Sequence, residues 1–413
     1  MRPMPVKFGV GVTSNEKLPE ELAAGYRYEQ VAEHHNYHVT ADNWAWPLKY
    51  PPITDRLVID GFSPNLNKCL HIGHLRNLAI ANSLSKMLTD AKFVALLGAT
   101  LGVKLDALDG WRYWTGYLKY NPTEYFDITL PDDVVKTHPQ KLEAGLPPAE
   151  LVPEVWDGPL GEVIVKRSDG RPLYAYYDLA FKEYVNPTHY ITGHEQKEHF
   201  ASLGLDKKHL PMGLVLGDDN KKLKSRTGDA IPASEVLKMI MDRLHSRASE
   251  GEERLGELDI QAKLAWNILA WNFLHTTREK NLKFEVESWT RPDQGGLYIS
   301  YTYASALKAL NSSPHCLKKL YKEQMAKQLF QETDLSLLGF AEQYNFYLNE
   351  AMSRLDPAPI ANFAFDLARL IGKAYETEKI RFGRWAFVQS FQHATWRLEM
   401  CLANLGMFNV VEV

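Results

Sequence analysis

The sequence predicts an α/β protein in which a parallel sheet with flanking helices is followed by a bundle of helices. The apolar run Arg56–Asp60 is typical of a buried strand, and the stretch Leu75–Leu88, which follows a polar loop, repeats apolar residues at helical spacing. A strand, a loop and then a helix is the opening of a nucleotide-binding α/β fold. Strand patterns nearly disappear after about residue 233, and this change predicts the helical second part.

Further elements extend both parts. The short apolar runs His189–Thr192 and Gly213–Leu216 are predicted to be further strands, with a helical pattern between them. Residues 103–160 are first aromatic and then rich in proline, so we interpret them as an insertion. Long helical patterns follow at Ile260–Thr277, Gly296–Leu310, Leu335–Ser353 and Ile360–Ala374. We expect a short N-terminal segment over 1–52, an α/β domain over 53–240 and a helical domain over 241–413.

The composition is that of an ordinary globular protein rather than of a disordered, fibrous or disulfide-stapled chain. The 413 residues are 45% hydrophobic and 24% charged, and the net charge is -4, so a nucleic-acid partner must bind a local basic surface. The widely spaced Cys69, Cys316 and Cys401 are typical of reduced thiols rather than of a zinc site. No run approaches the roughly 20 apolar residues of a membrane span. We expect a cytoplasmic protein with no membrane segment and no metal site.

Two histidines mark the start of the first helix, after a loop with a Pro-Asn turn. Free backbone N–H groups and the positive end of the helix dipole favour an anion at this point. His71 and His74 can donate hydrogen bonds to triphosphate oxygens, and Gly73 between them lets a nucleotide approach the backbone. Lys68 adds a mobile positive charge. Incidental histidines at a helix end are the plain alternative, but the preceding strand, turn and lysine favour the functional interpretation.

A second basic element, Lys221–Asp229, follows the last predicted strand. It combines three lysines, an arginine and a glycine, which is typical of a flexible cationic loop that closes on a polyphosphate. A solvated basic turn is the alternative for this loop taken alone. Its position after the histidine motif favours the first interpretation.

A third group of motifs lies in residues 162–182 and 193–199. Ser168-Asp169-Gly170-Arg171-Pro172 is followed by Tyr174 and, four residues later, by Asp178, whereas the second stretch contains Gln196 and His199. A spacing of four places Tyr174 and Asp178 on one face of a helical turn. If each residue is considered alone, Tyr174 could equally be interpreted as a core residue and Asp178 as a charged residue on the helix surface.

Together these motifs resemble those of the class I aminoacyl-tRNA synthetases, and the arginyl-tRNA synthetases in particular. The histidine motif has the family form HxGH behind Ser-Pro-Asn and a lysine, and the basic loop occupies the place of the KMSKS motif. The resemblance covers about residues 55–410. It implies a Rossmann-type parallel-sheet catalytic domain with an insertion, followed by an all-α helical-bundle domain that binds the anticodon.

The resemblance also implies roles for single residues. Asp60 and Asn65 would hold the α-amino and carboxylate end of arginine, while Tyr174 and Asp178 would engage the guanidinium and Gln196 would complete the site. A planar cation with five donors requires such carboxylate and aromatic partners. The implied catalytic residues are His71, His74 and Lys68. The implied ATP-binding residues are Gly73, His71, His74, Lys222, Lys224, Ser225 and Arg226.

The implied activity is the ATP-dependent formation of arginyl-adenylate and its transfer to the 3′ end of tRNA(Arg), with release of pyrophosphate and AMP. ATP enters with Mg2+ as a substrate complex, no tightly bound cofactor is expected, and the protein is expected to be a monomer. Three departures from the family pattern keep alternatives open. First, Ser225 stands in place of the second lysine of KMSKS, and Lys68 would substitute for that lysine. Second, the segment before the first strand is short. Third, Asp109–Arg112 only loosely matches a Gly-Asp-Trp-Gly element of the family. A paralogue with a non-tRNA acceptor and a non-catalytic RNA-binding protein are the alternatives.

Overall fold

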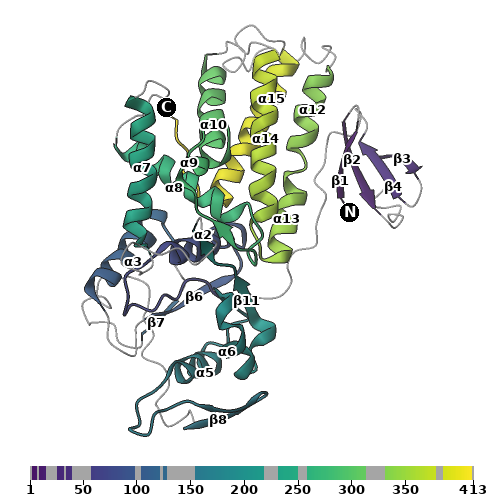
Figure 1. Cartoon of the computed structure of the whole chain (residues 1–413). Coiled ribbons are helices and arrows are strands. Elements are labelled where there is room, and N and C mark those ends of the chain that lie inside the picture. The colour runs from purple at the N-terminus through teal and green to yellow at the C-terminus, as the bar shows by residue number, and fades with distance from the viewer. Residues whose placement is uncertain are drawn as a thin grey trace. The chain divides into compact units, whose positions relative to one another are not determined.

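The structure, a computed structural model, describes most of the chain (Figure 1). The described residues are 2–6, 9–14, 26–31, 34–39, 57–97, 104–120, 124–127, 154–217, 231–249, 258–312, 331–377 and 385–411. They belong to two compact units. The α/β unit comprises residues 53–246 and 272–289, and the helical unit comprises residues 1–52, 247–271 and 290–413. The division falls inside helices α7 (Ala233–Ser249) and α8 (Leu258–Leu274).

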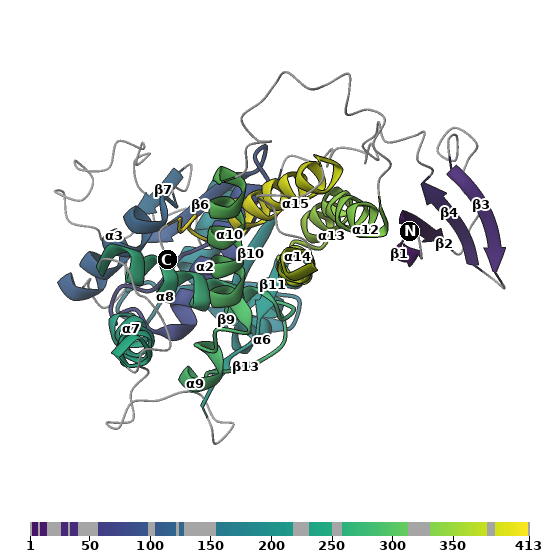
Figure 2. The same cartoon turned by 90° about the horizontal axis from the view of Figure 1, so that it is seen from above.

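A parallel five-stranded sheet is the centre of the α/β unit (Figures 1 and 2). Its order is β11 (His209–Met212), β10 (His189–Gly193), β5 (Val58–Asp60), β6 (Lys92–Leu97) and β7 (Glu124–Asp127). The chain therefore runs outward from β5 to β6 and β7 on one side, whereas β10 and β11 lie on the other. In such sheets, ligands bind outside the carboxyl ends of the strands where the strand order reverses. Here that point lies between β5 and β10.

The sheet corrects two expectations about its strands. Part of the predicted insertion belongs to the α/β pattern itself, because helix α3 (Leu105–Leu118) leads to β7, which pairs in parallel with β6. The aromatic residues of this stretch contribute to helix packing, since Trp111 and Trp114 are buried. The predicted strand at Gly213–Leu216 is only β12 (Val215–Leu216), and it pairs with β13 (Leu282–Lys283) outside the main sheet.

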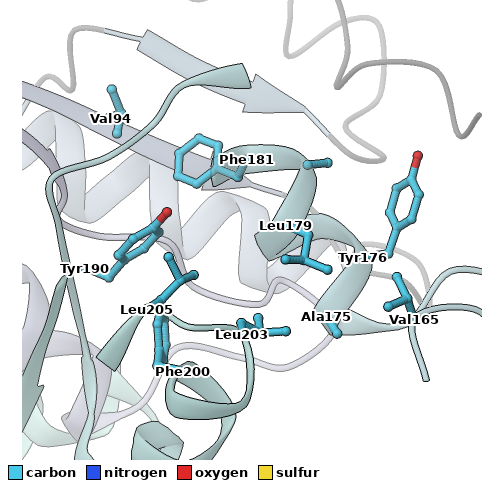
Figure 3. Close-up of a cluster of buried hydrophobic side chains, with 11 residues drawn as sticks. Val94, Val165, Ala175, Tyr176, Leu179, Phe181, Tyr190, Phe200, Leu203 and Leu205 are labelled. Carbon is cyan, nitrogen blue, oxygen red and sulfur yellow. The ribbon is translucent and has the colours of Figure 1, made fainter. Parts of the chain in front are cut away.

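Buried side chains hold helix α5 (Tyr174–Tyr184) and helix α6 (Lys197–Ser202) against the sheet (Figure 3). Tyr190 of β10 lies beside Phe200 of α6, with ring centroids 5.2 Å apart, and also contacts Phe181 of α5 edge to face. The cluster contains Val94, Val165, Ala175, Tyr176, Leu179, Ala180, Phe181, Tyr190, Phe200, Leu203 and Leu205. This packing gives fixed positions to the residues on the opposite faces of α5 and α6. The antiparallel hairpin of β8 (Val155–Gly158) and β9 (Gly161–Ile164) precedes these helices.

Helix α2 (Ile72–Met87) carries a fully buried arginine that joins three segments of the α/β unit. The Arg76 guanidinium donates to the carbonyl oxygens of Gly213 at 2.7 Å, Lys280 at 2.8 Å and Arg278 at 3.2 Å. These segments approach closely, because a Cβ on Gly213 would lie 2.3 Å from the Lys280 carbonyl oxygen. Arg76 thus satisfies backbone acceptors that water cannot reach.

Helices form most of the helical unit. Helix α14 (Ala358–Thr377) packs against α10 (Gly295–Asn311), α13 (Tyr344–Arg354) and α15 (Trp385–Asn404), and α12 (Glu332–Ala341) packs against α15 (Figures 1 and 2). The expected helices at 260–277, 296–310 and 360–374 are confirmed as α8, α10 and α14. The pattern at Leu335–Ser353 is divided into α12 and α13 by a turn at Glu342 and Gln343.

The helical unit also contains a small sheet formed by residues near the N-terminus. A four-stranded antiparallel sheet of order β1-β2-β4-β3 is built from β1 (Arg2–Val6), β2 (Gly9–Ser14), β4 (His34–Val39) and β3 (Tyr26–Val31).

Within the part of the chain that the structure describes, no helix has the length and apolar character needed to cross a membrane.

Replacing Arg76 tests whether its hydrogen bonds hold the α/β unit together. Arg76→Met keeps the length of the side chain but removes the side-chain donor from the buried Gly213 carbonyl oxygen and from the Lys280 carbonyl oxygen, so we expect a loss of about 2–4 kcal/mol in the free energy of unfolding. The measurement is urea denaturation followed by circular dichroism. Arg171→Met is the matched control, since the Arg171 side chain is exposed and pairs with the exposed Asp169. Equal denaturation midpoints for the two variants would contradict the role given to Arg76.

Candidate functional site

A cavity of about 490 Å³ lies at the carboxyl ends of β5, β10 and β11, where the strand order reverses. Its lining comes from the loop after β5, the first turn of α2, one face of α5 and the segment after β10. The predicted residues in the lining are Asp60, Asn65, His71, Gly73, His74, Tyr174, Asp178 and Gln196. Among the predicted site residues that the structure describes, only Lys68 is absent from the lining, and its side chain is exposed.

The two histidines cap the N-terminus of α2 reciprocally. The Nδ1 atom of His71 accepts from the backbone N–H of Gly73, and the Nδ1 atom of His74 accepts from the backbone N–H of His71, both at 3.1 Å. Their rings are close neighbours, with centroids 3.9 Å apart and an angle of 30° between the ring planes. Because both Nδ1 atoms are acceptors, the proton of each neutral ring lies on Nε2. The pair therefore presents two Nε2–H groups at the positive end of the helix dipole, an arrangement that suits an anion.

The basic loop Lys221–Asp229 lies outside the described residues, and the structure describes the chain up to residue 217 before it and from residue 231 after it. This loop contains the predicted residues Lys222, Lys224, Ser225 and Arg226. Before the loop, Val215 lines the cavity. After the loop, the backbone N–H of Ile72 donates to the carbonyl oxygen of Ile231 at 3.3 Å, and that of Ala233 donates to Leu70 at 2.9 Å. Val215 before the loop thus lines the same cavity as His71 and His74, and Ile231 after the loop is hydrogen-bonded to the first residue of α2.

Asp60 is a buried carboxyl group at the end of β5, with only 6% of the residue exposed. The hydroxyl of Ser63 donates to it and itself accepts from the backbone N–H of Leu96, so the single proton of Ser63 is directed at Asp60. Burial raises the pKa of Asp60 to about 7 against the lowering effect of the Ser63 hydrogen bond, and the charge of Asp178 adds to the rise. The cavity lining contains three carboxyl groups, those of Asp60, Asp178 and Glu195, and they favour a cationic ligand.

Asn65 and Tyr174 are joined directly. The side-chain amide of Asn65 donates to the Tyr174 hydroxyl at 2.6 Å, while its oxygen accepts from the backbone N–H of Asn67 at 3.1 Å. Tyr174 begins helix α5 and is 52% exposed. The predicted sharing of one helix face by Tyr174 and Asp178 is confirmed, because both line the cavity.

Several residues of the cavity lining were given no role by the sequence analysis. Ser63 lies in the Ser-Pro-Asn motif and His199 in the stretch 193–199. His199 contacts the Asp178 carboxylate through Nε2 at 2.6 Å. Asn77 lies on α2 and donates to the carbonyl oxygen of Ile191 at 2.8 Å, which ties the helix to β10. The motifs gave a position for Ser63 and His199 but no partner, since each partner is known only once the chain is folded.

The cavity combines two kinds of chemistry. The N-terminus of α2, with His71 and His74, supplies donors for an anion. Asp60 and Asp178 supply carboxylates for cationic groups, and Tyr174 adds an aromatic ring. A ligand pair consisting of a polyphosphate and a small molecule with two cationic groups fits this distribution.

Comparison with known proteins agrees with this description. No protein-family model matches the sequence. An arginine--tRNA ligase of Clostridium kluyveri is 29% identical over 238 residues, which are 52% of this chain and 41% of that protein. Arginine--tRNA ligases of Exiguobacterium sibiricum and Clostridium botulinum are 24% and 25% identical over 67% and 68% of this chain, and 49% and 50% of their own lengths. The chain therefore spans about half the length of the curated relatives it matches.

The fold is also that of solved arginyl-tRNA synthetases. The Thermus thermophilus enzyme superposes with a TM-score of 0.65 over 96% of this chain and 90% of its own, at 14% identity. The Plasmodium falciparum enzyme gives a TM-score of 0.66 over 94% of this chain and 86% of its own, also at 14% identity. The expected α/β fold class is thereby confirmed. By sequence and fold, this chain is related to the arginyl-tRNA synthetases, a family of class I aminoacyl-tRNA synthetases.

Proposed function

We propose that this chain is an arginyl-tRNA synthetase, which activates L-arginine with ATP and transfers it to the 3′ end of tRNA(Arg). One observation carries the proposal: the anion-binding end of α2 and the carboxyl groups of Asp60 and Asp178 line the same cavity at the reversal point of the sheet. ATP requires the first feature, and the two cationic groups of arginine require the second. The relatives named arginine--tRNA ligase support the choice of amino acid.

In the activation step, the carboxylate of arginine attacks the α-phosphorus of ATP in line with the departing pyrophosphate. An oxygen–phosphorus bond to arginine forms, the bond to the β-phosphate breaks, and arginyl-adenylate and pyrophosphate result. The Nε2–H groups of His71 and His74 donate to the phosphate oxygens, where negative charge builds up in the transition state. No side chain has to act as a nucleophile, since positioning and charge stabilisation supply the catalysis.

Arginine is assigned to the part of the cavity that contains the carboxyl groups. Asp60 and Asn65 hold the α-amino and carboxylate groups, and Tyr174 and Asp178 hold the guanidinium, with Gln196 beside them. Mg2+ arrives with ATP and neutralises the pyrophosphate. Lys222, Lys224, Ser225 and Arg226 of the basic loop and the exposed Lys68 are proposed to close on the triphosphate.

The remaining partners follow from the same activity. The helical unit is proposed to bind the anticodon region of tRNA(Arg), and the adenylate is then attacked by the hydroxyl group at the tRNA 3′ end, with release of AMP. The protein is proposed to act in the cytoplasm as a monomer.

The proposal is tested by pyrophosphate release across a panel of amino acids, with and without tRNA. We expect release that depends on L-arginine, together with radiolabelled arginine attached to tRNA. Release that depends on another amino acid would contradict the proposed substrate. Arginine-dependent release without a tRNA product would instead favour the paralogue that uses another acceptor.

Two variants of His74 separate its structural role from its chemical role. His74→Asn keeps a side-chain acceptor for the His71 backbone N–H but loses the Nε2–H donor, whereas His74→Ala loses both. We expect both variants to lower kcat roughly 10²–10³-fold, as does the loss of one preorganised donor. Only His74→Ala should also lower the thermal midpoint of unfolding. Turnover near that of the wild type in His74→Asn would contradict a catalytic donor at Nε2.

The raised pKa of Asp60 predicts that arginine binding depends on pH. Because this pKa is about 7 in the free site, Asp60 is mostly protonated at pH 6 and mostly ionised at pH 8. A cationic ligand favours the ionised form, so binding at pH 6 releases a proton and is weaker than at pH 8. Calorimetry in buffers with different ionisation enthalpies measures this proton.

Ser63→Ala is the variant that assigns the released proton to Asp60. The Ser63 hydrogen bond lowers the pKa of Asp60, so its removal shifts the loss of affinity to a higher pH. An unchanged pH profile in Ser63→Ala would show that another group titrates.

A further inference from the structure

His199 is a polar residue of the cavity lining to which the proposed mechanism gives no role. It lies on helix α6, three residues after Gln196, and lines the cavity. Its Nε2 atom is 2.6 Å from Oδ2 of Asp178, and the two side chains are 31% and 24% exposed. This contact joins α6 to α5 at the end of the cavity assigned to the guanidinium.

Because of this contact, the two oxygens of the Asp178 carboxylate differ in their hydrogen bonding. An ionised carboxylate only accepts hydrogen bonds, so His199 donates through Nε2–H and occupies Oδ2. Within the described part of the chain, the structure gives no hydrogen bond to Oδ1. Asp178 therefore keeps one oxygen for a ligand and has the other held in place.

The ring of His199 is itself fixed by packing. It meets the buried ring of Phe200 edge to face at 5.7 Å, and Phe200 stacks on His209 with centroids 4.6 Å apart and an interplanar angle of 5°. The Nε2 atom of His209 is 2.8 Å from the hydroxyl of Thr192, near the end of β10. Asp178 is thus connected through His199 to a stack anchored on the central sheet.

We propose that His199 is a positioning residue that sets the preference of the site for a guanidinium over its neutral isostere. The inference rests on the proposed function. A carboxylate held in one rotamer meets a cationic N–H group without further loss of side-chain freedom. The same fixed oxygen faces the carbonyl oxygen of a ureido group, as in L-citrulline, and repels it. A mobile Asp178 would turn aside and lose this discrimination.

The test is calorimetric binding of L-arginine and L-citrulline to the full chain and its variants. In His199→Leu, we expect the Kd for arginine to rise about tenfold, the size of one lost hydrogen bond to a charged group at a partly exposed site. The Kd for citrulline should stay within about twofold or fall, so the preference ratio collapses. His199→Gln places an amide donor near the former Nε2 and should restore most of the preference.

Three further variants keep the outcome interpretable. His194→Leu is the matched control, because His194 is an exposed histidine of the same segment outside the cavity lining, and it should bind like the wild type. In His199→Asn the side chain is too short to reach Asp178. This variant should therefore lose the preference for arginine as His199→Leu does, but without the large apolar group of leucine. In Asp178→Asn, a further change of His199 should alter the arginine Kd little, since the two residues act as one unit.

The possible failures are distinct. If wild-type protein binds neither ligand, the proposed function itself is contradicted. If it prefers arginine and both His199→Leu and His199→Asn keep that preference, the role of His199 is overturned and the proposed function stands. An equal weakening of arginine and citrulline in these variants would show a purely structural role and would also overturn the inference.

Discussion

Helix α2 is the element on which the site depends, because its polar side chains bind the backbone of segments that are distant in sequence. Arg76 holds Gly213 and the stretch of Arg278–Lys280, and Asn77 holds Ile191 of β10. At the same time, the histidine pair caps the helix with its Nδ1 atoms. One helix thereby aligns the reversal point of the sheet, the approach to the basic loop and the anion-binding donors.

The cavity brings hydrogen-bond donors and carboxyl groups together. The Nε2–H groups of His71 and His74 lie at the positive end of the α2 dipole, whereas Asp60 and Asp178 belong to β5 and α5, and burial raises the pKa of Asp60 so that it is a poor anion until a cation arrives.

Two local arrangements in the site could be predicted, because spacing along the chain determines them, whereas the roles of single residues came from the family resemblance. The interval between Tyr174 and Asp178 is a helical repeat, and the HxGH pattern after a strand indicates a helix terminus. The partners Asp178–His199 and Arg76–Gly213 lie 21 and 137 residues apart, so no local pattern reveals them. Strand β7 was missed because residues 103–160 were interpreted as an insertion, although its Tyr125 and Phe126 are residues favoured in strands. Its place in the sheet follows from pairing with β6, which no local pattern reveals.

A crystal structure with L-arginine and a non-hydrolysable ATP analogue would test most directly whether one cavity serves both substrates. The account predicts the guanidinium against Oδ1 of Asp178 and the triphosphate at the Nε2 atoms of His71 and His74. Phosphates bound away from the α2 terminus, or a guanidinium directed out of the acidic end, would contradict it.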